Sequence, residues 1–355
     1  MSIEQLVRPE ICGLQPYETA RQAPGMVRLN ANEAPWPADG SAVDGLNRYP
    51  EIRPLQLHTR LAAHYKVEPG MVLATRGSSE AIDLLIRAFC RAGIDNIIVT
   101  PPTFSMYRVY ADIQGARTIT APLLADSDFG LDVALILDKC APQTKLVFVC
   151  SPNNPTGGLV PLSAIRQLAA ARADRSLIVV DEAYAEYSEA PSAATLLPEY
   201  ENIAVLRTLS KAHSLAGVRC GAVLASERLI RLLNRILAPY ALATPVIDCV
   251  LRSLAADNLQ RSREAVGLVL EERERMSRGL LECPDIVRVW PSRTNFLLVQ
   301  FRNLASVEPR LSDAGILVRH FGHESALRNC ARISIGKPRE NDLLLAVLGR
   351  TVESA

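Results

Sequence analysis

The chain has 355 residues, of which 48% are hydrophobic and 22% are charged, and its formal net charge at pH 7 is +1. This balance is typical of a globular protein with a large buried core and argues against a disordered chain. Because the net charge is close to zero, we expect neither nucleic acid nor a membrane surface as a partner.

The N-terminal segment, residues 1–45, is expected to form an irregular arm. Prolines at positions 16, 24, 35 and 37 interrupt it, and proline breaks regular elements. Its early acidic residues and the lack of a long apolar run argue against a signal peptide. The eight cysteines are scattered without a C-x-x-C pair, and the histidines are not clustered. We therefore expect reduced thiols, a cytoplasmic location and no metal site.

Residues 46–243 alternate between helix-like and strand-like patterns. Apolar residues at helical spacing predict helices in PLQLHTRLAAHYK, SSEAIDLLIRAFCRAG, PTFSMYRVYADIQG and LSAIRQLAAARA, the second with Ser78 or Ser79 as its N-cap. Short apolar runs predict strands at MVLAT, NIIVT, RTITA, KLVFVC, SLIVVD, IAVLRT and CGAVLA. Strands that are apolar throughout are buried on both faces. The alternation therefore predicts an α/β fold with a mostly parallel sheet and helices on both faces.

The pattern changes in residues 244–355. A long helical tract from Thr244 to Leu281 precedes four strand-like segments, VRVWPS, TNFLLVQF, GILVRHF and ARISIG, and a closing helix, NDLLLAVLGRTV. This succession predicts a smaller α+β domain. We therefore expect a large domain over 46–243 and a small domain over 244–355, with the arm, 1–45, contributing part of the small domain.

Polar residues follow several of the expected strands, and open parallel sheets bind ligands at the C-terminal ends of their strands. After the first strand, Gly77, Ser78 and Ser79 open a helix, where free N–H groups favour an anion such as phosphate. After KLVFVC comes SPNNPTGG, whose asparagines could hydrogen-bond a ligand oxygen. Taken alone, the first pattern is better explained as an N-cap and the second as a polar turn.

Asp181 ends an apolar strand, where a carboxylate is costly to bury unless a cation pairs with it. The protonated ring nitrogen of a pyridine cofactor is one such cation, and Tyr184 could reach the same ring. A helix N-cap is an equally good explanation of Asp181 taken alone.

Ser210, Lys211 and Arg219 follow IAVLRT. A lysine with a lowered pKa can form an imine with an aldehyde, and serine and arginine can bind a phosphate. A lone lysine is better explained as a solvated charge. Together, however, the strand ends supply phosphate ligands, ring ligands and one lysine, which is the set of groups that pyridoxal 5'-phosphate requires.

The motifs SPNNPTG, DEAY and TLSKAHSLAGVRCG, in this order and spacing, resemble those of the fold-type I pyridoxal-phosphate aminotransferases of classes I and II. LNANEAPW, LNRYPE, PPTFSMY and ARISIG further resemble the histidinol-phosphate aminotransferase family, and the resemblance covers nearly the whole chain. It implies a homodimer with shared active sites. The implied reaction interconverts L-histidinol phosphate plus 2-oxoglutarate and imidazole-acetol phosphate plus L-glutamate, in L-histidine biosynthesis.

The resemblance implies that Lys211, Asp181 and Tyr184 are catalytic. Lys211 would form a Schiff base with the cofactor and then shuttle the proton, and Asp181 would pair with the pyridinium nitrogen. Asn154 and Tyr184 would approach the ring hydroxyl, while Tyr107 would stack on the ring.

The same resemblance implies two further groups of ligands. The cofactor phosphate would be bound by Gly77, Ser78, Ser79, Ser210 and Arg219, and by Tyr49 from the other subunit. The substrate would be bound by Tyr17, Asn32, Asn154, Arg319 and Arg332. Some family members have Gly-Ala-Asp-Glu where this chain has Gly-Ser-Ser-Glu, a change that backbone N–H groups tolerate.

Other functions fit part of this pattern. An aromatic or broad-range aminotransferase would keep Lys211, Asp181 and Arg219, and a threonine-phosphate decarboxylase also handles an amino phosphate. A non-catalytic ligand-binding module is a third alternative, but we see no basic helix-turn-helix before the matching motifs. His213 lies within the lysine motif and gains no role from the resemblance, so we expect it to be structural.

Overall fold

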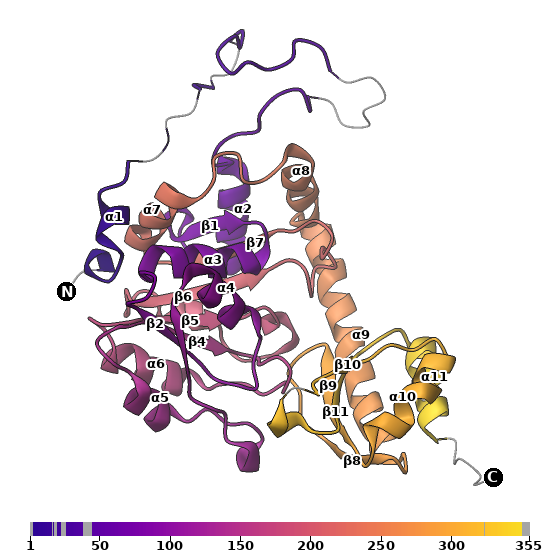
Figure 1. Ribbon diagram of the computed structural model, residues 1–355. Helices are drawn as coiled ribbons and strands as arrows, with labels where there is room; N and C mark the ends of the chain where they lie inside the picture. The colour runs from indigo at the N-terminus through magenta and orange to yellow at the C-terminus, as the bar shows by residue number, and fades with distance from the viewer. Residues whose placement is uncertain are drawn as a thin grey trace.

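The computed structural model describes residues 3–15, 17, 20–22, 26–37, 45–322 and 324–349. These residues form a seven-stranded sheet and a four-stranded sheet, linked by the long helix α9, Ala256–Leu281 (Figure 1). The strand order is β1-β7-β6-β5-β4-β2-β3 in the larger sheet and β10-β11-β9-β8 in the smaller one. The predicted fold class, a mostly parallel α/β sheet plus a smaller α+β part, is confirmed.

The strands of the larger sheet are almost entirely buried, apart from β3 at its edge. They are β1 (Val72–Thr75), β2 (Asn96–Val99), β3 (Arg117–Thr120), β4 (Thr144–Cys150), β5 (Leu177–Asp181), β6 (Ile203–Thr208) and β7 (Gly221–Ala225). Successive side chains point to opposite faces of a strand, so Leu146 and Phe148 enter one hydrophobic cluster and Val147 and Val149 enter another. Helices must therefore cover both faces, and they do.

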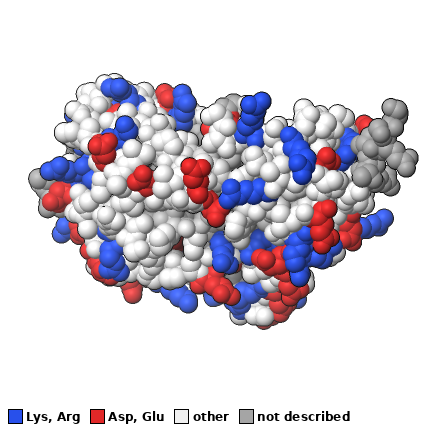
Figure 2. Space-filling model, turned by 90° about the horizontal axis from the view of Figure 1, so that it is seen from below, with Lys and Arg blue, Asp and Glu red and all other residues white. Residues whose placement is uncertain are grey.

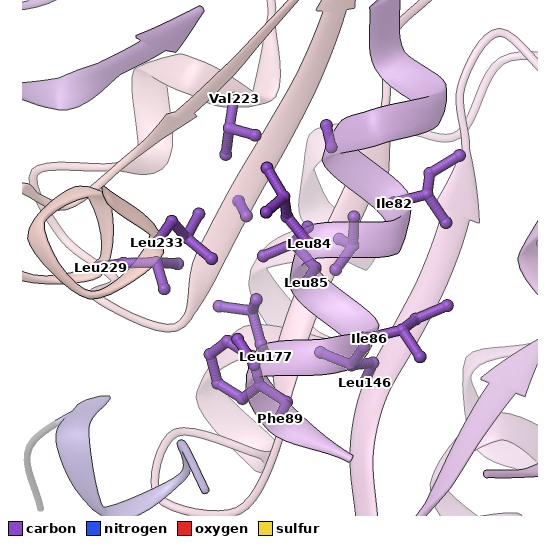
Figure 3. Close-up of a cluster of buried hydrophobic side chains, with 14 of the residues drawn as sticks. Ile82, Leu84, Leu85, Ile86, Phe89, Leu146, Leu177, Val223, Leu229 and Leu233 are labelled. Carbon is purple, nitrogen blue, oxygen red and sulfur yellow. The ribbon is translucent and has the colours of Figure 1, made fainter. Parts of the chain in front are cut away.

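The first face is covered by α3 (Gly77–Phe89), α4 (Met106–Gln114) and α7 (Glu227–Ile236), with the short α1 (Pro9–Cys12) against them. The second face is covered by α2 (Leu55–Tyr65), α5 (Val133–Lys139), α6 (Leu162–Ala171) and α8 (Thr244–Ser253). Figure 3 shows the first of these clusters, in which Leu84, Leu85 and Phe89 of α3 lie close to side chains of the sheet and of α7.

The smaller sheet contains β8 (Ile286–Val289), β9 (Phe296–Phe301), β10 (Arg319–His320) and β11 (Cys330–Ser334). It packs with α9, α10 (Leu304–Asp313) and α11 (Pro338–Gly349) around a separate core. Phe129, which follows η3 of the larger part, stacks obliquely on Trp290 of the smaller part, with 5.6 Å between ring centroids. A shared apolar cluster therefore joins the two parts.

Single 3-10 turns complete the described secondary structure. They are η1 (Ile3–Gln5), η2 (Pro69–Met71), η3 (Ala125–Ser127), η4 (Ala185–Tyr187), η5 (Ala193–Leu196) and η6 (Ser325–Leu327). None of the described helices is long and apolar enough to cross a membrane. On the face seen in Figure 2, basic and acidic side chains are interspersed.

The direction of β7 decides which loops meet. β7 runs antiparallel to both β1 and β6, and Gly221 is the partner of Thr75 and of Thr208. The start of β7 therefore lies at the same edge as the ends of β1 and β6. This arrangement brings the start of α3, the loop after β6 and Arg219 together.

Several sequence predictions need correction. The helices α1, α5, α7 and α10 were not predicted, and α1 lies in the arm that was expected to be irregular. The tract from Thr244 to Leu281 is two helices, α8 and α9, separated by Leu254 and Ala255. α3 begins at Gly77 with Arg76 at its N-cap position, so neither Ser78 nor Ser79 is the N-cap. The Glu80 carboxylate instead accepts a bond from the Arg76 backbone N–H at 2.7 Å.

The start of the arm and the helix α8 both pack against the larger part of the molecule. Ile3, Leu6 and Val7 of the arm are buried in the cluster that contains α3 and α7, on the larger part of the molecule rather than the smaller one. Val250 of α8 is likewise buried against the larger sheet. The exact division of the chain into domains remains a proposal, and α9 is the element that passes between the two cores.

Gly221 allows α3 to approach the sheet edge closely. A Cβ at this position would lie 2.7 Å from the Ser78 amide nitrogen, the Gly77 carbonyl carbon and the Arg207 carbonyl oxygen. We predict that Gly221→Ala lowers the free energy of unfolding by about 1–3 kcal/mol, because all three contacts are with backbone. Thermal or urea unfolding measures the change.

Gly217→Ala is the matched control, since a Cβ at Gly217 meets nothing within 4 Å. Its effect should stay within about 0.5 kcal/mol. Equal stability of the two variants would contradict the proposed close packing.

Candidate active site

A cavity of about 220 Å³ opens at the C-terminal edge of the larger sheet. Residues from β4, β5 and β6, from the start of α3 and from β11 of the smaller part reach it. The lining residues are Ser78, Ser79, Phe104, Cys150, Asn154, Asp181, Ala183, Tyr184, Thr208, Ser210, Lys211, Arg219 and Arg332. Segments distant in the sequence therefore meet in one cavity, as the strand-end pattern predicted.

One end of the cavity is suited to an anion. Ser78 and Ser79 occupy the first turn of α3, whose N–H groups have no partner within the helix. A Cβ at Gly77 would lie 2.6 Å from an Nη atom of Arg219, so the guanidinium lies directly against this turn. Arg219 also donates a bond of 3.3 Å to the Ser210 hydroxyl. The helix dipole, a cation and two or more hydroxyls thus favour a phosphate-sized anion here.

Asp181 lies at another wall of the cavity and is only 2% exposed. Its carboxylate accepts bonds from the Tyr107 hydroxyl at 2.7 Å and from the Ala183 backbone N–H at 3.2 Å. No cationic nitrogen among the described residues lies within 4.0 Å of it. Burial raises the pKa of this carboxyl to about 6, although the bond from Tyr107 acts in the opposite direction. A cationic ligand would relieve this cost.

Tyr107 does not have the predicted role. We expected it to stack on a cofactor ring, but its own ring stacks on Phe148 at 4.7 Å between centroids, and its side chain is 1% exposed beneath Asp181. Phe104, in the same motif, lines the cavity instead. The reason is the turn before α4: Met106 begins the helix, so Tyr107 faces the core and Phe104 faces the cavity.

Lys211 is accessible from the cavity, with its Nζ atom 5.6 Å from the centroid of the Tyr184 ring. Partial burial lowers the pKa of its amine, and the positive charges of Arg332 and Arg219 lower it further, against a smaller effect of Asp181. A lysine with a lowered pKa is more often present as the free amine, which is the nucleophilic form.

Asn154, Tyr184 and Arg332 form a connected group. The Asn154 amide donates to the Tyr184 hydroxyl at 3.4 Å, and its carbonyl oxygen accepts from the Arg332 guanidinium. The same guanidinium lies 5.2 Å from the centre of the Phe296 ring. Arg319 is the direct cross-strand partner of Arg332 but is exposed and does not line the cavity.

Three predicted ligands lie away from the cavity within the same chain. Asn32 and Tyr49 line a separate surface pocket near the start of α8, and Tyr49 stacks on Tyr240 with 4.5 Å between ring centroids. Tyr17 is 70% exposed near the end of α7. In Figure 1 the arm extends beyond the ends of α2 and α8.

Sequence reasoning missed four lining residues: Phe104, Cys150, Ala183 and Thr208. Cys150 and Thr208 are the last residues of β4 and β6. The rule that ligands bind at the ends of parallel strands would have found both. Ala183 lies within the DEAY motif and Phe104 within PPTFSMY, so only their side-chain directions were missing.

The described residues also contain a buried ionic group behind the cavity that was not predicted. Arg207 donates bonds of 2.7 Å to Glu182 and to Glu186, and its guanidinium lies 4.9 Å from the centre of the Tyr65 ring. Because the acids follow Asp181 in the sequence, this group fixes the loop between β5 and η4.

Comparison with known proteins bears on this cavity. Residues 23–348 match the family model for class I and II aminotransferases. A histidinol-phosphate aminotransferase of Stenotrophomonas maltophilia (strain R551-3) is 45% identical over 348 residues, which cover 97% of this chain and 95% of that protein. A second one, from Xylella fastidiosa (strain 9a5c), is 42% identical over 351 residues, covering 98% of this chain and 96% of that protein.

A solved structure is also similar. The histidinol-phosphate aminotransferase of Sinorhizobium meliloti, in complex with pyridoxal-5'-phosphate, aligns with a TM-score of 0.77 at 26% identity. The alignment covers 85% of this chain and 82% of that one.

The buried Asp181 carboxyl generates a pH-dependent prediction for the ligand-free protein. Its pKa is raised from 3.8 to about 6, so the folded state binds the extra proton. The contribution of Asp181 to stability is therefore fully present below pH 4 and is lost as pH rises to 6. Relative to Asp181→Asn, the wild type should lose up to about 1.4 kcal/mol of unfolding free energy per pH unit in this window.

Urea unfolding of both proteins at several pH values tests this prediction. Taking the difference between wild type and variant cancels the titration of other groups. The Asn side chain keeps an oxygen for Ala183 and can donate to the Tyr107 hydroxyl. A difference that does not change between pH 4 and 7 would contradict the raised pKa.

Proposed function

Since this chain belongs to the class I and II aminotransferase family, we propose that it transfers an amino group between L-histidinol phosphate and 2-oxoglutarate. The products are imidazole-acetol phosphate and L-glutamate, a reaction of L-histidine biosynthesis. The enzyme is a pyridoxal-phosphate-dependent transaminase. The observation that carries the proposal is the single cavity in which Lys211, Asp181 and an anion-binding turn converge.

The residues of the cavity fit the cofactor. The N–H groups of the first turn of α3, with Ser210 and Arg219, would hold its phosphate. The buried Asp181 carboxylate, which has no cation of the described chain within 4.0 Å, would accept the protonated ring nitrogen. Asn154 and Tyr184 are adjacent polar groups that suit the ring hydroxyl.

When bound, pyridoxal phosphate supplies an electron-withdrawing ring that stabilises negative charge at the carbon that bears the substrate's amino group. Asp181 would keep the ring nitrogen protonated, because an ionised buried carboxylate favours a nearby cation. Burial and the positive charges of two arginines lower the pKa of the Lys211 amine, so Lys211 would take the proton at Nζ and return it. Tyr107 holds Asp181 in place through its 2.7 Å bond.

The substrates of the two half-reactions carry different anions, a carboxylate in glutamate and a phosphate in histidinol phosphate. We propose that Arg332 binds the anionic group of either substrate, because a guanidinium forms paired hydrogen bonds with both. Its position at the cavity, bonded to Asn154, supports this role. Arg319, beside it on β10, would contribute mainly to the phosphate of histidinol phosphate.

We further propose a homodimer in which the arm of one subunit completes the cavity of the other. Exposed large apolar side chains of the arm and of the segment directly after it support this: Tyr17, Met26, Val27, Leu29, Trp36, Leu46 and Tyr49. Leu29 is 91% exposed and Trp36 is 80% exposed, which is costly for such side chains unless they are covered. Tyr49 would then reach the cofactor phosphate, and Tyr17 and Asn32 the substrate, across the subunit boundary.

A cytoplasmic location is also part of the proposal. All eight cysteines are free, and five of them are buried. Free thiols persist in reducing compartments. We also expect neither nucleic acid nor a membrane as a partner.

The choice of amino donor tests the proposed function. The purified enzyme is given 2-oxoglutarate with histidinol phosphate, phenylalanine or threonine phosphate, and glutamate formation is measured. Histidinol phosphate should give the highest kcat/KM. Preference for phenylalanine would indicate an aromatic aminotransferase, and carbon dioxide release from threonine phosphate without a keto acid would indicate a decarboxylase.

Two arginine variants test the substrate assignment. We predict that Arg332→Lys slows both half-reactions by about 10–100-fold, because a charge-assisted hydrogen bond contributes about 1.5–3 kcal/mol. Arg319→Ala should slow mainly the half-reaction with histidinol phosphate. Single-turnover rates with glutamate and with histidinol phosphate measure each half separately, and equal losses in both halves for Arg319→Ala would contradict the assignment.

A further inference from the structure

Behind the cavity wall, three potential metal ligands converge from separate segments of the chain. His64 lies near the end of α2, Glu186 lies in η4, and His213 lies two residues after Lys211. A ring nitrogen of each histidine and a carboxylate oxygen of Glu186 all lie within 4.8 Å of one another. The two imidazoles meet edge to face, with 4.9 Å between their centroids. Because the histidines are far apart in the sequence, the sequence alone did not indicate that they would lie close together.

The polar atoms of this group lack partners. The His213 side chain is 4% exposed, yet neither of its ring nitrogens has a hydrogen-bond partner. The nearest carboxylate oxygen, Oε1 of Glu186, is 4.0 Å from His213 Nε2. Glu186 Oε2 is also buried without a partner. Buried polar groups are nearly always satisfied, so three such atoms at one place point to a missing ligand.

We propose that His64, Glu186 and His213 bind a divalent transition-metal ion, with zinc as the best fit to two imidazoles and one carboxylate. Zinc takes nitrogen and oxygen ligands at about 2.0–2.2 Å in a tetrahedron, so ligand atoms lie about 3.4 Å apart. The ligand atoms, which lie within 4.8 Å of one another, need to approach by up to about 1.4 Å to reach this spacing. Water would be the fourth ligand.

The charges nearby are compatible with a cation. Arg207 is close, but it is bonded to both Glu182 and Glu186, and these three side chains together carry one net negative charge. The positive charge of Arg263, which also acts on His64, brings the local sum to zero. Arg207 occupies Oε1 of Glu186 at 2.7 Å and leaves Oε2 free for the metal. A hydrogen bond to a ligating carboxylate is the usual way in which the surroundings orient a metal ligand.

The site also has an entry path and a structural consequence. His64 and Glu186 are only partly buried, so an ion can reach the group from solvent. A bound ion would tie α2 to the loop after β5 and to the loop that carries Lys211. Its role is therefore to stabilise these loops, and it takes no part in proton transfer.

Metal titration of the full-length holoenzyme tests the proposal. After chelator treatment, the protein is titrated with Zn²⁺ by calorimetry and with Co²⁺ as a spectroscopic probe. We expect one Zn²⁺ per chain and a higher Tm with Zn²⁺. His64→Gln and His213→Phe should each weaken binding by roughly tenfold or more, since even indirect partners of a metal ligand change affinity that much.

His58→Gln is the matched control, because His58 is a partly buried histidine on the same helix, α2, and is not among the three ligands. It should bind Zn²⁺ like the wild type. His213→Phe should be more stable than the metal-free wild type, since it removes two unpartnered nitrogens, but should gain no Tm from Zn²⁺.

Three results would overturn the proposal. They are the absence of stoichiometric Zn²⁺ binding, unchanged affinity in both His64→Gln and His213→Phe, and a thiolate-to-Co²⁺ charge-transfer band, which would place the metal on cysteine. His64→Gln keeps the test decisive if His213→Phe does not fold, because His64 is only partly buried.

Discussion

The buried carboxylate of Asp181 is the constraint on which the rest of the site depends. It ends a strand whose other side chains are all apolar, and it has no cation of the described chain within 4.0 Å. It is only 2% exposed, and it accepts two hydrogen bonds from the described chain, one from the Tyr107 hydroxyl and one from the Ala183 N–H. The site therefore suits a cationic ring, and the proposed binding of pyridoxal phosphate would supply the missing positive charge.

The topology of the sheet places the other groups around this carboxylate. Because β7 is antiparallel to β1 and β6, Arg219 at its start reaches the N-terminus of α3 at the end of β1. Gly77 and Gly221 allow that approach. A Cβ at Gly77 would collide with the Arg219 guanidinium, and a Cβ at Gly221 would collide with the backbone of Gly77 and Ser78. Lys211 lines the same cavity, and burial and the arginines near it lower the pKa of its amine.

The fold class and most of the cavity could be predicted from the sequence. Apolar runs and the polar residues that follow them can be recognised in the sequence without a structure. Ser78, Asn154, Asp181 and Lys211 were predicted from that pattern and from the motifs around them. The direction of a side chain within a turn leaves no such pattern in the sequence. Tyr107 was therefore predicted to line the site, where the structure has Phe104. Contacts between distant segments leave no pattern in the sequence either. The ionic group of Arg207, Glu182 and Glu186 and the contact between His64 and His213 were therefore not predicted. The cross-subunit roles of Tyr17, Asn32 and Tyr49 stay predictions.

The pKa of the Asp181 carboxyl, measured by ¹³C NMR with Asp181→Asn to assign the resonance, tests the central claim most directly. In the ligand-free enzyme it should be about 6, and binding of pyridoxal phosphate should lower it, because the ring cation favours the ionised form. A pKa near 4 in the ligand-free enzyme, or no decrease on binding, would contradict the account.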